Sequence, residues 1–134
     1  MATIVAAQPA DTTSLKELYD RSISFSEEKL DSIAWYANYI EEQSNDLGFS
    51  KGRILATRLR GLHSDLTGNY DEAIRHFLST LTASREEHHI EYEISALSDL
   101  AIVYTEIKQP VKARQVYLEC LHLIEKRSEP HAII

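Results

Sequence analysis

The histidines and the single cysteine are the side chains of this 134-residue chain that could bind a metal or act as a nucleophile. His88 and His89 are adjacent in the acidic stretch EEHHIEYE, residues 86–93. Adjacent residues on a helix point about 100° apart, so these two imidazoles cannot bind one metal ion by themselves. A metal site or a pH sensor is one interpretation of this stretch. A solvent-exposed turn between helices is the other, and we favour it.

Cys120 is the only cysteine, which excludes an intramolecular disulfide and favours a reducing, cytoplasmic location. It lies among the apolar residues of an expected helix, so we interpret it as a buried packing residue rather than a nucleophile. His63, His76 and His122 fall on three different expected helices. There is no glycine-rich phosphate loop and no serine–histidine–aspartate order. The sequence therefore predicts no metal, no cofactor and no enzymatic activity.

Three aromatic residues, Trp35, Tyr36 and Tyr39, lie close together in the sequence. Such rings could stack a ligand, or they could pack against the neighbouring helical unit. We favour packing, and we keep the ligand patch as the alternative.

The composition is that of a globular protein with an acidic balance. Apolar residues make up 43% of the chain and charged residues 26%. The net charge of −7 argues against nucleic acid as a partner, because phosphate binding requires a basic surface. The first fifty residues hold nine acids and three bases, whereas KGRILATRLR at 51–60 is locally basic. No stretch approaches the roughly 20 apolar residues of a membrane span, so no membrane association is expected.

Apolar residues recur at alternating steps of three and four, which predicts helices, and no stretch alternates for long enough to predict a strand. The expected helices cover about 14–23, 26–46, 51–66, 70–86, 90–107 and 110–127. Ser14 with Glu17 and Asn69 with Glu72 are expected N-terminal capping pairs. Pro110 suits the first turn of the last helix, where its missing N–H costs nothing.

One pattern of residue types occurs twice, forty residues apart. When 51–90 is laid over 91–130, the matched pairs include Gly61 with Ala101, Ala73 with Ala113, Phe77 with Tyr117 and Thr80 with Cys120. Small residues fall on small residues, and rings on rings. Two antiparallel helices approach closely only where one presents Gly or Ala, and rings fill the space between adjacent pairs. A fixed period of this size predicts a stack of helix pairs, none of which buries its apolar face alone.

These residues resemble the tetratricopeptide repeat. The residues that carry the resemblance are Gly68, Tyr70 and Ala73 in one unit and Leu100, Ala101 and Tyr104 in the next. The period of forty, in place of the family's usual 34, is similar to that of the long-period subgroup. The resemblance covers about 51–127 and extends weakly to 14–50.

The resemblance implies an all-α fold of antiparallel helix pairs, stacked as a short right-handed superhelix. It implies a flexible leader at 1–13, a single domain at 14–127 with units at about 14–50, 51–90 and 91–127, and a tail at 128–134. The first helix of each pair would line a concave groove that binds an extended peptide or a partner helix. The groove residues carried over from the family, with Lys51 on the same face, are Lys51, Leu55, Arg58, Leu62, Asp65, Ser95, Ser98, Ile102 and Thr105.

The basic end of this groove could pair with acidic residues of a peptide, and Arg58 suits a bidentate contact with a carboxylate. The alternative is that Arg58 and Lys51 are solvent-exposed helix charges and that Leu62 is a core residue.

The expected function is that of a non-catalytic interaction module, or scaffold, with a protein or peptide partner. The alternative is a sensory, regulatory or oligomerisation segment of a larger bacterial signalling protein such as a diguanylate cyclase or kinase, because long-period repeats often precede such output domains. Helix 110–127 stays apolar at 116, 117, 120, 121 and 124, so we expect further repeats or a homodimer to pack against it. A third interpretation is a helical domain that binds a small ligand.

Overall fold

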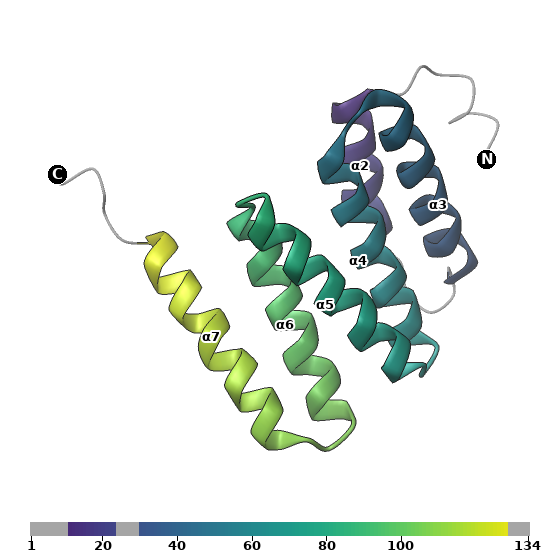
Figure 1. The fold of residues 1–134 in the computed structure, drawn as a ribbon. Helices are drawn as coiled ribbons and strands as arrows, with labels where there is room; N and C mark the ends of the chain where they lie inside the picture. Colours follow the sequence, from purple (N-terminus) through teal and green to yellow (C-terminus); the bar gives the residue numbers. More distant parts are fainter. Residues whose placement is uncertain (1–10, 24–29, 129–134) are drawn as a thin grey trace, which may run out of the picture.

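The protein is built from helices in the part of the chain that the structure describes, residues 11–23 and 30–128. In the computed structural model these residues form six helices and no strand. The helices are α2 (Thr12–Ser22), α3 (Leu30–Leu47), α4 (Ser50–Leu66), α5 (Tyr70–Glu86), α6 (Ile90–Glu106) and α7 (Pro110–Ser128). Each packs against the next in chain order, and α7 lies at one edge of the stack (Figure 1). The predicted all-α repeat fold is confirmed.

Most helix limits match the sequence-based prediction, and the first helix differs because of its cap. It begins at Thr12, two residues earlier than predicted, because Asp11 rather than Ser14 is the N-cap. Oδ1 of Asp11 accepts a hydrogen bond from the amide of Ser14 at 2.7 Å. Asn69 does occupy the N-cap position of α5, but its side chain makes no capping hydrogen bond. The predicted start of the second helix, at 26–29, lies outside the described residues.

Four turns repeat one backbone geometry at intervals of twenty residues. Each contains a residue with positive φ: Gly48 at 66°, Gly68 at 81°, His88 at 59° and Lys108 at 61°. The following amide donates back to the preceding helix, with N–O distances of 2.8 Å for Phe49 to Ser44, 2.8 Å for Asn69 to Ser64, 2.9 Å for His89 to Ser84 and 2.8 Å for Gln109 to Tyr104. These bonds form the Schellman motif, which satisfies carbonyl groups at the end of a helix.

Two clusters of buried side chains form the core. One lies mainly among α2, α3 and α4 and includes Leu15 and Ile33. The other lies among α5, α6 and α7 and includes Phe77 and Leu100. Leu62 of α4 packs against both clusters, so apolar packing is continuous from α2 to α7.

Small residues allow the paired helices to approach closely, as the repeat predicts. A Cβ at Gly61 of α4 would lie 2.4 Å from Cε1 of Phe77 on α5. Glycine therefore leaves the room that the buried Phe77 ring occupies. Ala73 and Ala113, which the forty-residue period matches, are both buried.

Candidate functional site

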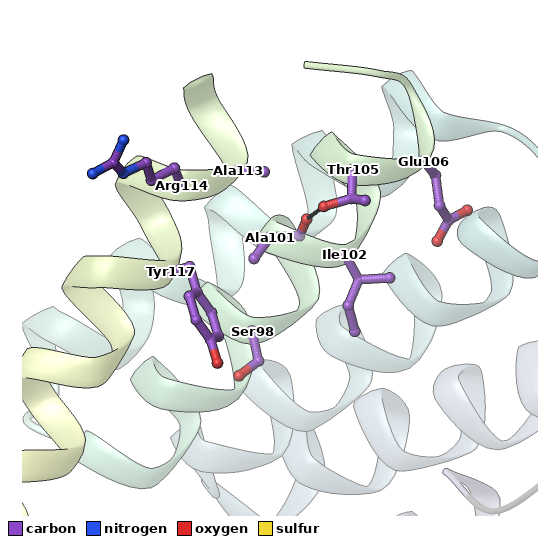
Figure 2. A pocket seen from close by; sticks show the side chains of 8 residues that line it. All are labelled: Ser98, Ala101, Ile102, Thr105, Glu106, Ala113, Arg114 and Tyr117. Atoms are coloured by element: carbon purple, nitrogen blue, oxygen red, sulfur yellow. Dashed lines mark hydrogen bonds between the residues drawn. The ribbon is translucent and has the colours of Figure 1, made fainter. Parts of the chain in front are cut away.

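A groove of about 620 Å³ lies between α6 and α7 at the edge of the stack, and we call it the terminal groove. Its lining residues are Ser98, Ala101, Ile102, Thr105 and Glu106 from α6 and Ala113, Arg114 and Tyr117 from α7. Figure 2 shows the Tyr117 ring on α7 beside Ser98 on α6. The small residues Ala101 and Ala113 are buried, whereas Ile102 and Tyr117 are each 54% exposed. The groove therefore offers an apolar surface that is open to solvent.

The equivalent surface one unit earlier in the chain is covered by α6. Phe77, forty residues before Tyr117, is only 1% exposed. It belongs to the same buried cluster as Leu100 and Val103 of α6. None of the described helices covers Tyr117 in this way, so the terminal groove is the uncovered member of a pair of related surfaces.

Three of the four groove residues predicted from the second unit lie together in the terminal groove; they are Ser98, Ile102 and Thr105. The fourth, Ser95, bonds to its own helix, because its Oγ donates to the carbonyl of Glu91 at 3.1 Å. It is not among the residues that line the groove.

The groove residues predicted from the first unit make contacts within the helical stack. Leu55 is fully buried in the core, so its side chain cannot line a groove, which corrects the prediction. Leu62 is half-buried between the two core clusters. The Nζ atom of Lys51 lies 5.2 Å from the ring centroid of Tyr92, a cation–π contact.

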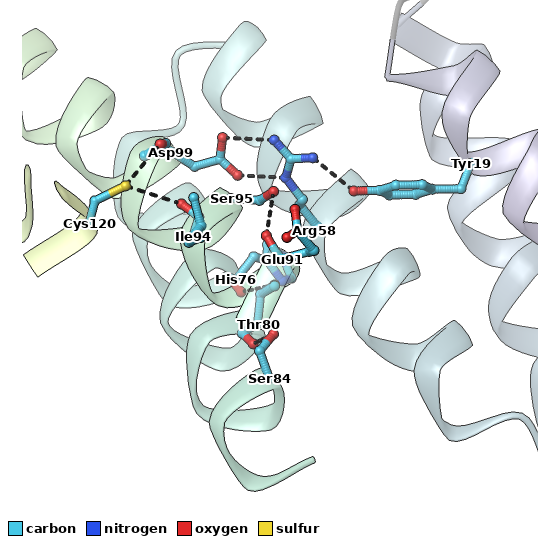
Figure 3. A network of polar contacts seen from close by, with 11 residues as sticks. Tyr19, Arg58, His76, Thr80, Ser84, Glu91, Ile94, Ser95, Asp99 and Cys120 are labelled. Atoms are coloured by element: carbon cyan, nitrogen blue, oxygen red, sulfur yellow. Dashed lines mark hydrogen bonds and ion pairs between the residues drawn. The ribbon is translucent and has the colours of Figure 1, made fainter. Parts of the chain in front are cut away.

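Arg58 of α4 bonds to side chains of α2 and α6, and so links three alternate helices of the chain (Figure 3). Its Nε donates to Oδ2 of Asp99 at 2.7 Å and its Nη2 to Oδ1 at 3.1 Å. Its Nη1 donates to Oη of Tyr19 at 2.8 Å. The side chains of Arg58 and Asp99 are 16% and 7% exposed. Arg58 therefore makes a bidentate contact with a carboxylate of its own chain, whereas the prediction from the sequence was a contact with a carboxylate of a bound peptide.

Burial and charge act on both members of this ion pair. Burial alone would lower the pKa of Arg58, but the hydrogen bonds and charge of Asp99 outweigh it and raise that pKa. Burial also raises the pKa of Asp99, against the opposing effect of Arg58. Either charge would be costly to bury without the other.

Asp65 on α4 faces a second carboxyl group, that of Glu106 on α6. Burial, a hydrogen bond shared with Glu106, and the charges of Glu106 and Asp99 together raise the pKa of Asp65 to about 6. Its Oδ1 is buried and has no hydrogen-bond donor among the described residues. Asp65 thus lies between two helices of the stack, as Arg58 does.

Cys120 has the environment of a packing residue, as predicted. It is 1% exposed. Its Sγ lies 3.4 Å from Oγ of Ser98 and donates to the carbonyl of Ile94 at 3.6 Å. Burial keeps the thiol away from solvent and from reagents.

The histidine-rich stretch forms the turn between α5 and α6. His88 is the residue with positive φ in that turn, and His89 is the N-cap of α6. Among residues 11–23 and 30–128, no group of three or more His, Cys, Asp or Glu side chains could hold a metal ion. None of the helices described is long and apolar enough to cross a membrane.

The aromatic residues of α3 pack against one another. Trp35 stacks on Tyr39 with ring centroids 5.3 Å apart and meets Tyr36 edge-on at 5.1 Å. Tyr36 and Tyr39 pack against the core cluster of α2, α3 and α4. This arrangement supports the packing interpretation, with Trp35 37% exposed at the surface.

Sequence reasoning missed the wall of the terminal groove that α7 provides. The expected exposed edge of helix 110–127 did include Tyr117, which the repeat matches to Phe77. Arg114 gave no signal, because its counterpart forty residues earlier is the apolar Ile74. Arg114 is exposed at the uncovered edge, and this exposure is what explains an Arg where the preceding unit has Ile74.

These observations define the class of the protein, an all-helical repeat built from stacked antiparallel helix pairs. A family model described as tetratricopeptide repeat matches residues 54–126, and the chain belongs to the tetratricopeptide repeat family. No curated protein and no solved structure matched the chain. Tetratricopeptide repeats generally mediate protein–protein interaction.

Proposed function

We propose that the protein is a non-catalytic interaction module that binds a protein partner through the terminal groove. The family supports the general role, since its repeats generally mediate protein–protein interaction. The net charge of −7 favours a protein over a nucleic acid as the partner. A cytoplasmic location is part of the proposal, because the chain has a single cysteine.

One observation carries this proposal: two related surfaces of the same chain differ in whether a helix covers them. Phe77 is 1% exposed under α6, and Tyr117 is 54% exposed in the terminal groove. Grouped apolar side chains in a concave surface are typical of a site that a partner buries.

The proposed site differs from the basic groove expected from the sequence. Arg58 is already paired with Asp99, and Lys51 lies over the ring of Tyr92. A peptide carboxylate would have to displace Asp99 from a buried ion pair, which is costly. The proposal therefore keeps Ser98 and Ile102 as contact residues and assigns Lys51 and Arg58 to the stability of the stack.

The test compares two matched variants, Ile102→Asp in the terminal groove and Leu78→Asp outside it. Leu78 lies on α5, is 44% exposed and does not line the groove. Partner proteins that bind both the wild type and Leu78→Asp are purified. The affinity of each partner for the wild type and for the two variants is then measured by calorimetry. We expect Ile102→Asp to weaken the affinity by at least about tenfold, because a charge then replaces an apolar contact. Equal affinity for both variants would remove the terminal groove from the site.

A second candidate function is self-association, as in an oligomerisation or regulatory segment of a larger signalling protein. The outer side of α7 favours it, because Val111, Leu118 and Leu121 are 70%, 53% and 37% exposed. Light scattering over a range of concentrations tests this candidate, with Leu118→Asp as the variant. A dimer that Leu118→Asp dissociates supports it, and a monomer at every concentration contradicts it.

A further inference from the structure

The groove between α4 and α5 provides a template for the helix that the terminal groove would bind. The corresponding residues of the two grooves, forty positions apart, are Arg58 and Ser98, Gly61 and Ala101, Leu62 and Ile102, Asp65 and Thr105, Leu66 and Glu106, Ala73 and Ala113, Ile74 and Arg114, and Phe77 and Tyr117. The first groove holds α6, so α6 shows which residues such a helix presents.

The face of α6 that enters the first groove is aliphatic at its centre. Ala96, Leu100 and Val103 are fully buried and recur at steps of four and three, so they share one face of the helix. They belong to the buried cluster that contains Phe77. Ser98, Ile102 and Thr105 of α6, which line the terminal groove, lie on the opposite side of the helix. Glu106, which also lines it, lies at the edge between the two sides and faces Asp65.

The acidic residue at the edge of this face is matched by a cation, Arg58, in the first groove. The cation of the terminal groove, Arg114, stands at the position of Ile74 on the other helix and not at that of Arg58. Asp99 is buried against Arg58, at 2.7 Å. Ser98, which stands in place of Arg58, has no charge, and its Oγ lies beside the Cys120 thiol. A carboxylate buried opposite Ser98 would lose its hydration without gaining a counter-ion.

We propose that the terminal groove binds an amphipathic α-helix of a partner protein, in the position that α6 has on α4 and α5, with a neutral residue where α6 carries Asp99. This inference rests on the proposed function and specifies the partner. The aliphatic faces of α4 and α6 are already packed inside the chain, α4 against α3 and α6 against α5. A second copy of the chain would have to unfold part of itself to supply either helix, and could otherwise offer only the exposed side of α7, an outcome that the dimer measurement below tests.

The test uses two synthetic peptides with the sequence of residues 90–106, one with the native Asp99 and one with Asp99→Asn. Their affinities for the full chain are measured by fluorescence anisotropy, for the wild type and for Ser98→Arg. We expect the wild type to bind the neutral peptide about tenfold or more tightly than the acidic one. We expect Ser98→Arg to reverse this preference, because it restores the cation that Arg58 supplies in the first groove.

The reversal separates binding at the terminal groove from exchange of the peptide with α6. Exchange would favour the acidic peptide in both proteins, since Arg58 is present in both, and that outcome would overturn the proposal. Ile102→Asp should abolish peptide binding and Leu78→Asp should leave it unchanged, with circular dichroism confirming that both variants are folded.

The remaining outcomes are also decisive. If neither peptide binds, but Ile102→Asp still weakens a purified partner, the proposed function stands and this helical partner is wrong. If neither binds and light scattering shows a dimer that Ile102→Asp dissociates, the occupant is a second copy of the chain. If Ile102→Asp changes neither partner nor peptide binding, both proposals fail.

Discussion

Arg58 on α4 and Asp99 on α6 form a bidentate ion pair across the boundary between two helix pairs, with Nε 2.7 Å from Oδ2 and Nη2 3.1 Å from Oδ1. The same guanidinium donates to Tyr19 on α2. Three helices that are not consecutive in the chain thus share one polar contact. We expect such a contact to favour one relative rotation of successive pairs, which apolar packing alone specifies less sharply.

Replacing Arg58 by Met should destabilise the protein, because it leaves the Asp99 carboxylate buried without its cation. We expect a loss of about 3–5 kcal/mol in the free energy of unfolding at neutral pH, measured by urea denaturation. The pKa of Asp99 is raised by burial, and more so without Arg58. A carboxyl group whose pKa is raised in the folded state stabilises that state at pH values below the pKa of the unfolded chain, and this contribution is lost as the pH rises. The loss of stability caused by Arg58→Met should therefore be smaller in acid.

The double variant Arg58→Met with Asp99→Leu is the control for this prediction. It removes both charges and should recover most of the lost stability, since an apolar pair can replace a buried ion pair at little cost. A single variant as stable as the wild type at neutral pH would contradict the role of the ion pair.

Phe77→Ala and Tyr117→Ala should differ sharply in stability, although the repeat places the two rings at equivalent positions. Phe77 is buried, so its truncation should cost about 3–5 kcal/mol. Tyr117 is 54% exposed, so its truncation should cost less than about 1 kcal/mol. Thermal and urea denaturation measure both. Equal losses would mean that a second molecule covers Tyr117 in solution.

Lys108→Gly should stabilise the turn between α6 and α7. Lys108 has φ of 61°, a left-handed conformation that costs a residue with a side chain about 1 kcal/mol relative to glycine. We expect the melting temperature to rise by a few degrees. Gly68→Ala is the matched reverse change, since Gly68 has φ of 81° in the equivalent turn, and it should lower the melting temperature. A shift of the melting temperature in the same direction for both variants would contradict the equivalence of the turns.

Asp65 should make stability fall as the pH rises through about 6. Burial and the neighbouring Glu106 raise its pKa to about 6 from the ordinary value of 3.8. The proton is therefore held more tightly in the folded state, and the stability it provides is complete below about 4 and lost by about 7. Solvent screening of this partly exposed site reduces the expected change to about 1 kcal/mol.

The variant Asp65→Asn tests this assignment, because it cannot ionise. Urea denaturation between pH 4 and pH 7 should show a flatter profile for Asp65→Asn than for the wild type. Identical profiles would show that another group is responsible for the dependence on pH.

The sequence predicted the helices and their pairing because small residues and rings recur at a fixed interval, which packing requires. Gly61 and Phe77 show how direct this link is, since a Cβ at 61 would collide with the ring. The groove residues were predicted less well, because their environment depends on which helix lies next to them. Leu55 is buried and Arg58 is paired with Asp99, and both facts follow from contacts between units that helix periodicity does not encode.

The left-handed residues at 48, 68, 88 and 108 give the four described junctions from α3 to α7 the same conformation, whether a junction joins two helices of one pair or two neighbouring pairs. The backbone conformation of these turns therefore does not distinguish a junction within a helix pair from a junction between two pairs. Only the side chains on the helices impose the forty-residue period. Because the backbone of each junction is the same, one helix is the smallest unit that can be added to such an array. An array of this kind can therefore end after either helix of a pair, and it exposes a different surface in each case.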